Sequence, residues 1–185
     1  MWWTKKQKEL LDISANHANI IVYDSETINN SINSIKSQAA FSKIFYAMKA
    51  NFNPELLKLI SKHNIGFECV SPGEVNLLKK VLPKISSEEI LFTPNFAPKD
   101  DYIWALKNNL LITLDNLYLL EAWPQIFRGK KILVRIDPGK GEGHHDFVKT
   151  AGNISKFGIP VNKINKLKEY IGKYNIEVIG LHVHN

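Results

Sequence analysis

Five ionisable side chains stand at or near the ends of apolar runs in this sequence. Lys49 follows the run "IFYAM", Glu68 lies within "IGFECV", and Arg135 lies within "KILVRI". His182 and His184 alternate along the run "EVIGLHVH". Because the carboxyl ends of parallel strands meet at one edge of a sheet or one mouth of a barrel, we expect these side chains to converge.

Lys49 is the residue that most clearly suggests a reaction. It lies between Ala47 and Ala50 and precedes the turn "NFNP". At a barrel mouth such a lysine loses hydration, which lowers its pKa and makes the neutral amine available to attack a carbonyl and form a Schiff base. The alternative, from position alone, is a strand-end lysine whose amine reaches solvent.

The histidines suggest a second kind of chemistry. His182 and His184 share one face of a strand, and His144 and His145 lie in the glycine-rich stretch "GKGEGHHDF", so together they suggest a metal site. His182 and His184 resemble the His-x-His pair of metal-dependent barrel hydrolases. In those enzymes, however, the pair belongs to the first barrel strand and further ligands follow it, whereas here the pair comes late in the chain. We therefore predict no metal. We interpret the glycine-rich stretch as a loop over the mouth of the site, because no helix opens directly behind it to cradle a phosphate.

The elements that must position these residues alternate along the chain. Apolar runs predict strands, and stretches with apolar residues at helical spacing follow most of them. Asn53 with Pro54, and Ser71 with Pro72, are typical helix starts. From the second strand onward the strands recur about every 20–25 residues, which is the rhythm of βα units in a parallel sheet. The predicted strands cover residues 19–23, 43–48, 65–70, 89–93, 110–114, 131–136 and 177–184, and the predicted helices cover 53–63, 71–82, 97–109 and 113–123.

A barrel explains the pattern better than an open sheet. An open doubly wound sheet that binds a nucleotide normally carries a glycine-rich phosphate turn after its first strand, and "YAMKANFNP" is not such a turn. In a barrel, by contrast, polar residues at several strand ends meet above one mouth. The sequence therefore predicts an α/β barrel.

Composition narrows the class of protein further. The chain has 185 residues, of which 44% are hydrophobic and 23% charged, as expected for one globular core. No apolar run approaches the roughly 18 residues of a membrane span, and the first residues lack the apolar stretch of a signal peptide, so we expect a cytoplasmic protein with no membrane partner. The single cysteine, Cys69, fits a reducing compartment. The net charge of +6 comes from scattered lysines, so we predict no nucleic-acid partner.

Several motifs occur together in a fixed order, namely "FYAMKANFNPELLKLI", "GFECVSPGEV", "RIDPG", "HH…TAG…SKFGI" and "GLHVHN". In this order and spacing they strongly resemble the pyridoxal-phosphate-dependent decarboxylases of fold type III, and within them the diaminopimelate decarboxylases. The wording "ILFTPNFAPKDDY" and "RIDPGKGEGHHDFVKTAG" is most similar to the decarboxylase half of the bifunctional aspartate kinase/diaminopimelate decarboxylases, although no kinase portion is present. Ornithine decarboxylases share the lysine motif but not the stretch "HH…TAG…SKFGI".

The resemblance implies a reaction and the residues that serve it. It implies decarboxylation of meso-diaminopimelate to L-lysine and CO₂, the last step of lysine biosynthesis, with pyridoxal 5'-phosphate as cofactor and a homodimer as the intact enzyme. Lys49 matches the lysine that joins to the cofactor aldehyde, and His184 matches the histidine that stacks on the cofactor ring. Glu68 stands where many relatives carry an aspartate near that lysine, and Arg135 matches an arginine of the active-site floor. Glu74 matches a further acidic position, unless it serves only as a negative charge at a helix start.

These matches give a set of expected site residues. We predict Lys49 and His184 as catalytic residues, and these two together with Glu68 and Arg135 as cofactor-binding residues. Two other functions remain open. One is a non-catalytic barrel protein that only carries pyridoxal phosphate, and the other is a decarboxylase of another basic amino acid.

The resemblance also implies a fold, an incomplete (β/α)₈ TIM barrel of the alanine racemase-like type. Residues 1–42 would form a helix, a strand and a helix that lead into the barrel, and residues 43–185 would form a partial barrel with about six of its eight strands. Relatives continue with a phosphate loop, a glutamate that faces the pyridine nitrogen, and a C-terminal β-domain that the first strand joins. We therefore interpret the chain as an N-terminal fragment that is inactive alone.

Overall fold

A parallel sheet of short strands forms the centre of the computed structural model, which describes residues 1–17, 19–139 and 156–184. From β1 to β6, each strand pairs with the next strand in the sequence. The last strand, β7, pairs with β5, which also pairs with β6. Every strand pair is parallel. The strands are β1 (Phe45–Ala47), β2 (Gly66–Cys69), β3 (Ile90–Phe92), β4 (Leu111–Leu114), β5 (Lys131–Asp137), β6 (Ile159–Pro160) and β7 (Glu177–His182).

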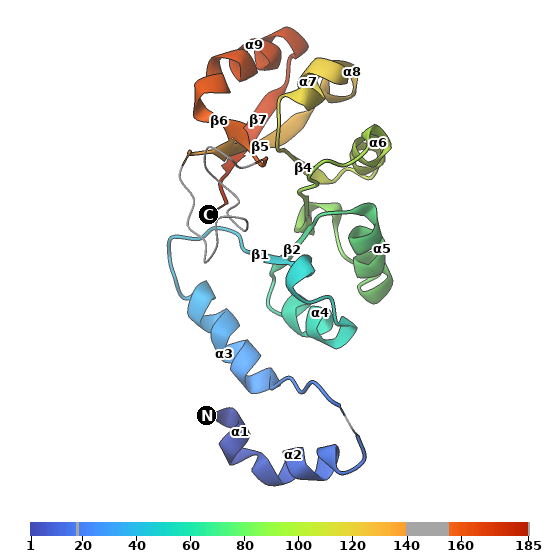
Figure 1. Cartoon of the computed structure of the whole chain (residues 1–185), viewed down its shortest axis with the longest axis vertical. Helices are drawn as coiled ribbons and strands as arrows, with labels where there is room; N and C mark the ends of the chain where they lie inside the picture. Colours follow the sequence, from blue (N-terminus) through green and yellow to red (C-terminus); the bar gives the residue numbers. More distant parts are fainter. Residues whose placement is uncertain (18, 140–155, 185) are drawn as a thin grey trace.

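Helices connect the strands and follow them around the outside of the sheet (Figure 1). They are α4 (Pro54–Ser61), α5 (Pro72–Val81), α6 (Lys99–Lys107), α7 (Tyr118–Ala122), α8 (Pro124–Phe127) and α9 (Ile164–Tyr174), with short 3₁₀ turns η1 (Met48–Ala50), η2 (Ser87–Glu89) and η4 (Val161–Lys163). This order of strands and helices confirms the predicted partial α/β barrel.

The predicted helix starts form as the sequence indicates. The Asn53 side chain accepts hydrogen bonds from the backbone N–H groups of Glu55 and Leu56, and Pro54 opens α4. Ser71 caps α5 in the same way, since its hydroxyl accepts from the N–H of Glu74. Each cap satisfies a backbone donor that the first helical turn leaves without a partner.

One predicted helix is shorter than expected. The stretch 113–123 was expected to be a single helix, but its first two residues end β4, α7 covers only Tyr118–Ala122, and a separate helix, α8, begins at Pro124. Trp123 takes a non-helical conformation, with φ −132° and ψ 46°. Proline removes a backbone donor and restricts the residue before it, which explains the break at this point.

The N-terminal part contains an incorrect prediction. Residues 19–23 were expected to form a strand, but they run as an unpaired segment between α2 and α3, and Ile21 is 81% exposed. An apolar run becomes a strand only when another strand satisfies its N–H and C=O groups, and none does so within the part of the chain that the structure describes. The helices of this part are α1 (Trp2–Lys5), α2 (Gln7–Ser14) and α3 (Ser25–Lys36), and its boundary at residues 42 and 43 stays a prediction.

A single side chain ties these helices together. Asp24 caps α3 by accepting from the N–H of Thr27 at 2.9 Å, and the same carboxylate accepts from Lys6 Nζ at 2.7 Å. The Lys6 ammonium and the Thr27 donors hold the pKa of Asp24 at about 2, below its usual value. This ion pair therefore joins the residue before α2 to the residue before α3.

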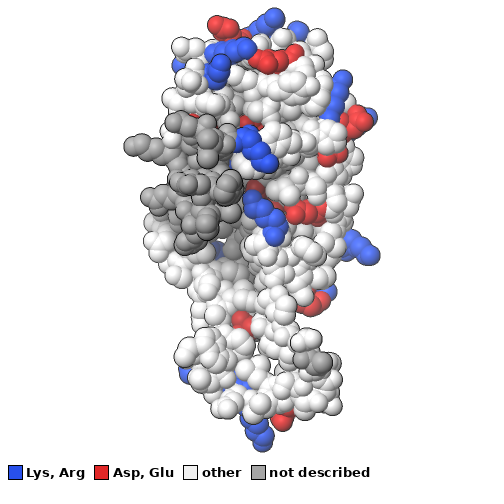
Figure 2. Space-filling model, in the orientation of Figure 1, with Lys and Arg blue, Asp and Glu red and all other residues white. Residues whose placement is uncertain are grey.

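Charged side chains are interspersed over the surface drawn in Figure 2, where lysines and carboxylates alternate along the same face. This agrees with the scattered lysines of the sequence. Among the described residues, no helix is both long enough and apolar enough to cross a membrane.

Gly66 gives a first testable prediction, because β2 passes very close to its neighbours there. A Cβ at this position would lie 2.6 Å from the Phe45 ring and 2.8 Å from the backbone oxygen of Glu89. We expect Gly66→Ala to lower the free energy of unfolding by about 1–3 kcal/mol, as overpacked cores do. Urea unfolding followed by circular dichroism measures it.

The matched control for this change is Gly172→Ala, which lies in α9 where an added Cβ meets nothing within 4 Å. Alanine favours the helix, so this variant should gain about 0.5–1 kcal/mol. Equal unfolding midpoints for Gly66→Ala and the unchanged protein would show that the approach of β1, β2 and η2 is looser than described.

Candidate active site at the strand ends

The register of the strands places the predicted site residues on one face of the sheet. Ala47 pairs with Glu68, and Glu68 pairs with Leu91, two residues before Thr93. Leu91 pairs with Leu111, Thr113 with Leu133, and Arg135 with His182. Side chains two apart on a strand share a face, so Glu68, Thr93, Arg135 and His182 all point to the inner side of the curved sheet. The alternate residues, such as Phe67, Phe92 and Val134, are buried against the helices.

Lys49 is held at the end of β1 by its neighbours on both sides. Met48 is fully buried, and its sulfur accepts from the Cys69 thiol at 3.4 Å. On the other side, Asn51 and Asn53 turn the chain into α4, since Asn51 Oδ1 accepts from the N–H of Asn53 at 3.0 Å. Lys49 itself is exposed, so the loss of hydration that the sequence predicted is not seen.

Glu68 is fixed on β2 by a neighbour from the next strand. Its Oε1 accepts a short hydrogen bond from the hydroxyl of Thr93, the residue that follows β3. Because Glu68 pairs with Ala47, it lies opposite the last residue of β1, two residues before Lys49. The carboxylate is thus held at the strand ends, half-buried, where it acts on the other charges of the site.

Arg135 brings a positive charge into the interior. The residue is only 6% exposed, its Nη1 donates to Asn95 Oδ1 at 3.3 Å, and its guanidinium lies 5.0 Å from the centre of the Phe157 ring. Burial lowers the pKa of Arg135, and the carboxylates of Asp115, Glu68 and Asp137 oppose that effect. These three carboxylates therefore surround the arginine from β2, β4 and β5.

His182 shows that the predicted residues converge. Burial lowers its pKa most, followed by the nearby Arg135, whereas Glu68 raises it and His184 and Lys49 lower it further. Charges act on a pKa in this way only at short range. Lys49 follows β1 and His182 ends β7, strands that lie far apart along the sheet, so the sheet curves enough to bring its distant parts together. The charges of Lys49, Glu68, Arg135 and His184 thus all act on His182, as expected if these side chains converge, and the site and its roles stay predictions.

His182 and Asp115 were not predicted as site residues. The role of His182 was left open, although its spacing from His184 already placed both on one face. Asp115 directly follows β4, but it was assigned to the start of a helix. The signal that could have found it is the one that indicated Lys49, a polar residue at the end of an apolar run.

Glu74 serves the start of a helix. Its Oε2 accepts a hydrogen bond from the backbone N–H of Val70 at 2.7 Å, so it stabilises the start of α5, which agrees with the alternative that Glu74 acts only at a helix start.

The histidines were also considered as metal ligands. Within the described ranges, no group of three or more His, Cys, Asp or Glu side chains is placed to hold a metal ion. His144 and His145, and the loop that contains them, lie outside the described residues.

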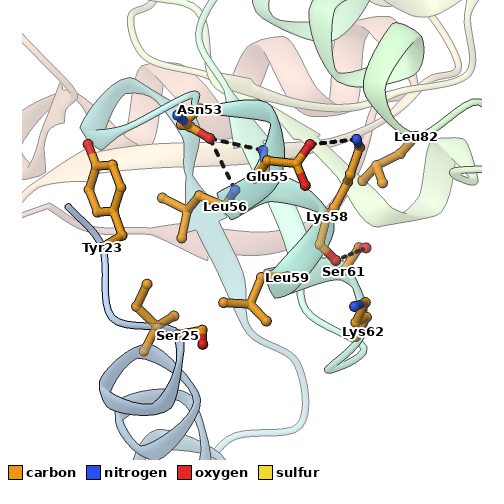
Figure 3. Close-up of a pocket in the computed structure, with 11 residues that line it drawn as sticks. Tyr23, Ser25, Asn53, Glu55, Leu56, Lys58, Leu59, Ser61, Lys62 and Leu82 are labelled. Atoms are coloured by element: carbon orange, nitrogen blue, oxygen red, sulfur yellow. Dashed lines mark hydrogen bonds and ion pairs between the residues drawn. The ribbon is translucent and has the colours of Figure 1, made fainter. Parts of the chain in front are cut away.

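A surface hollow between α3 and α4 is separate from these residues. It has a volume of about 540 Å³ and includes Tyr23, Asn53, Glu55 and Lys58 in its lining. Figure 3 shows that its polar groups bind one another, since Asn53 caps α4 and Lys58 donates to Glu55 at 2.7 Å. These groups stabilise their own helix, so the strand ends are the better candidate for chemistry.

The chain belongs to the pyridoxal-dependent decarboxylases, because the model of their pyridoxal-binding domain matches residues 25–185. The cofactor that this membership implies is pyridoxal phosphate. Among individual proteins, the chain is 33% identical over 165 residues to a diaminopimelate decarboxylase of Buchnera aphidicola subsp. Baizongia pistaciae, which covers 88% of this chain and 38% of that protein. The predicted resemblance to the diaminopimelate decarboxylases is thereby confirmed.

Solved structures show the same fold. The crystal structure of a diaminopimelate decarboxylase superposes with a TM-score of 0.84 at 24% identity, covering 96% of this chain and 42% of that one. The arginine decarboxylase of Paramecium bursaria Chlorella virus superposes with a TM-score of 0.73 at 25% identity, covering 86% of this chain and 42% of that one. The chain thus spans about two fifths of the length of the proteins that it matches.

Proposed function

We propose that this chain is the cofactor-binding part of an enzyme that decarboxylates meso-diaminopimelate to L-lysine. The observation that carries the proposal is the convergence of Lys49, Glu68, Arg135, His182 and His184 at the strand ends of a chain from this family. The names of the similar proteins support the substrate. The proposal includes a cytoplasmic location and, for the intact enzyme, a homodimer.

The side chains at the strand ends fit pyridoxal phosphate by their chemistry. Lys49 presents a primary amine that solvent can reach, which suits attachment to an aldehyde. His184 is half-buried just beyond β7 and offers a flat ring as a support for the cofactor. When bound, the cofactor draws electrons away from the substrate carbon that loses CO₂.

The remaining side chains set the charge around the amine. Thr93 donates to Glu68 and so keeps a carboxylate at the strand ends, on the strand next to β1. Burial and the nearby Arg135 lower the pKa of His182, so its imidazole is neutral at pH 7. His182 can therefore accept or donate a hydrogen bond at the strand ends without adding a second positive charge beside Arg135.

The experiment that tests the proposal measures CO₂ release by the protein expressed from its complete gene, with pyridoxal phosphate added. We expect meso-diaminopimelate to be converted to L-lysine. The similarity to an arginine decarboxylase makes another basic amino acid the second candidate, so L-arginine, L-ornithine and L-lysine are compared at equal concentrations. Cofactor binding without CO₂ from any of these would support a non-catalytic carrier.

His184 gives a further prediction. If its ring supports the cofactor, His184→Ala should weaken the binding of pyridoxal phosphate by about 2- to 10-fold, the equivalent of an aromatic contact worth about 0.5–1.5 kcal/mol. Attachment at Lys49 should persist. Absorbance titration measures the affinity, and His17→Ala, at an exposed residue near the N-terminus, is the control. Equal affinities for the two variants would contradict a stacking role.

A further inference from the structure

Asp115 is a buried carboxylate that the proposed function does not use. It directly follows β4 and is 1% exposed. Its Oδ1 accepts from Asn116 Nδ2 at 2.9 Å, whereas Oδ2 is buried and has no hydrogen-bond partner in the part of the chain that the structure describes. Burying a carboxylate with one oxygen unsatisfied is costly, so a nearby positive charge is expected to compensate for it.

The strand register supplies that charge. Thr113 pairs with Leu133 and Leu114 with Val134, so the next position places Asp115 opposite Arg135. Arg135 in turn pairs with His182 on β7. The three residues therefore form one row across β4, β5 and β7, which lie side by side in Figure 1.

Asp115 and Arg135 are also each the largest charge effect on the pKa of the other. Burial raises the pKa of Asp115 to about 6, and Arg135 is the one charged group that counters this rise. Of the three carboxylates that counter the effect of burial on Arg135, Asp115 is the strongest, ahead of Glu68 and Asp137. Each group is thus the main charge compensation of the other.

We propose that Asp115 is a positioning residue, whose buried carboxylate holds the Arg135 guanidinium in place beside Glu68 and His182. The inference rests on the proposed function, because it makes Asp115 the support of a residue in that site. The alternative is that Asp115 only stabilises the turn after β4 through Asn116. Asn116 bonds only Oδ1 of Asp115, whereas the buried carboxylate as a whole lies opposite the buried Arg135 in the strand register, which favours the positioning role.

The test follows the Arg135 side chain directly by nuclear magnetic resonance. The sequence has only two arginines, Arg128 and Arg135, so each Nε–H signal can be assigned, and the exposed Arg128 is an internal reference. At pH 7.5 we expect exchange of the Arg135 Nε–H with solvent to be about tenfold faster in Asp115→Asn than in the unchanged chain, because hydrogen exchange reports local opening. The exchange of Arg128 should not change.

A matched control keeps every charge. The Tyr102 hydroxyl on α6 is buried near Asp115 and has no hydrogen-bond partner among the described residues, and Tyr102→Phe removes it. We expect Arg135 exchange to be unchanged in this variant. Equal acceleration in Tyr102→Phe and Asp115→Asn would show general loosening and overturn the proposal, as would no acceleration in Asp115→Asn.

Thermal unfolding separates the positioning role from loss of fold. A carboxyl whose pKa is raised in the folded state destabilises the protein above that pKa, so stability should fall as the pH rises from about 4 through about 6. Asp115→Asn removes the penalty and should melt no lower than the unchanged chain at pH 7.5. Faster Arg135 exchange in a variant that is at least as stable cannot come from unfolding.

A second test uses the unchanged chain and varies the pH. Lowering the pH through about 6 protonates Asp115 and should raise the ratio of Arg135 to Arg128 exchange, and Asp115→Asn should lack this rise. The other titratable groups that face the pair are Tyr102 on α6, Glu68 on β2, Asp137 on β5 and His182 on β7. A rise that persists in Asp115→Asn would assign the effect to one of these and overturn the proposal.

These measurements need no cofactor, so the two proposals can fail separately. If Arg135 responds as expected but pyridoxal phosphate does not attach at Lys49, the positioning role of Asp115 stands and the proposed function fails. If the cofactor attaches at Lys49 and Arg135 does not respond to Asp115→Asn, the inference fails alone.

Discussion

Borohydride reduction is expected to attach pyridoxal phosphate irreversibly to the unchanged protein, and replacing Lys49 by alanine is expected to abolish this attachment. Lys49 is exposed just after β1, and its charge acts on His182 at the end of β7. Attachment to an aldehyde needs a primary amine, and alanine has none. In the complete enzyme we also expect CO₂ release to fall to a small fraction, because the cofactor is no longer attached at the strand ends.

Peptide mass spectrometry after reduction measures this prediction. The control is Lys58→Ala, which removes a lysine on α4 that forms a surface ion pair with Glu55 at 2.7 Å. Its labelling at Lys49 should equal that of the unchanged protein. If the label is found on another lysine, or persists in Lys49→Ala, Lys49 is not the attachment point and the proposed site is misplaced.

Much of the fold could be predicted because its signals are local. Asn53 and Pro54 mark the start of α4 through cap chemistry that involves only the next few residues. The segment 19–23 has the same apolar composition as the true strands, yet it lacks a neighbouring strand in the described structure. Whether an apolar run pairs depends on the rest of the fold, so composition alone gave the wrong result there.

The candidate site could be predicted in part for a related reason. Lys49, Glu68 and Arg135 stand out in sequence because each is ionisable within an otherwise apolar run. Asp115 shares that property, but it also resembles a helix start, and only the register of β4 against β5 shows its relation to Arg135. When the role of a side chain depends on its neighbour on the next strand, the sequence around that side chain does not predict the role.

The hydration of Lys49 is a second property that its position in the sequence did not predict. The small residues Ala47 and Ala50 suggested a dehydrated amine, but exposure depends on what covers the end of the strand. Met48 fills the buried position of this turn, and Lys49 and Ala50 after it are exposed. Which residue of the turn packs into the core therefore decides the exposure, and the size of the neighbours does not.

Replacing Phe92 by alanine is expected to cause a large loss of stability. Phe92 on β3 is 0% exposed, its ring centre lies 6.3 Å from that of Trp104 on α6, and it pairs with Cys69 and Ile112 on the flanking strands. Truncation leaves a cavity between sheet and helix and costs about 3–5 kcal/mol. Because domains are stable by only about 5–15 kcal/mol, much of the folded state should be lost under mild urea.

The matched control is Phe52→Ala, since Phe52 is 59% exposed and should contribute much less. Phe92 also directly precedes Thr93, which donates to Glu68, so a loosened β3 releases the carboxylate that Thr93 holds at the strand ends. We therefore expect Phe92→Ala, but not Phe52→Ala, to weaken attachment of pyridoxal phosphate at urea concentrations where the protein is still folded. Similar unfolding midpoints for the two variants would contradict the burial of β3, and full attachment in a destabilised Phe92→Ala would separate the stability of the core from the geometry of the site.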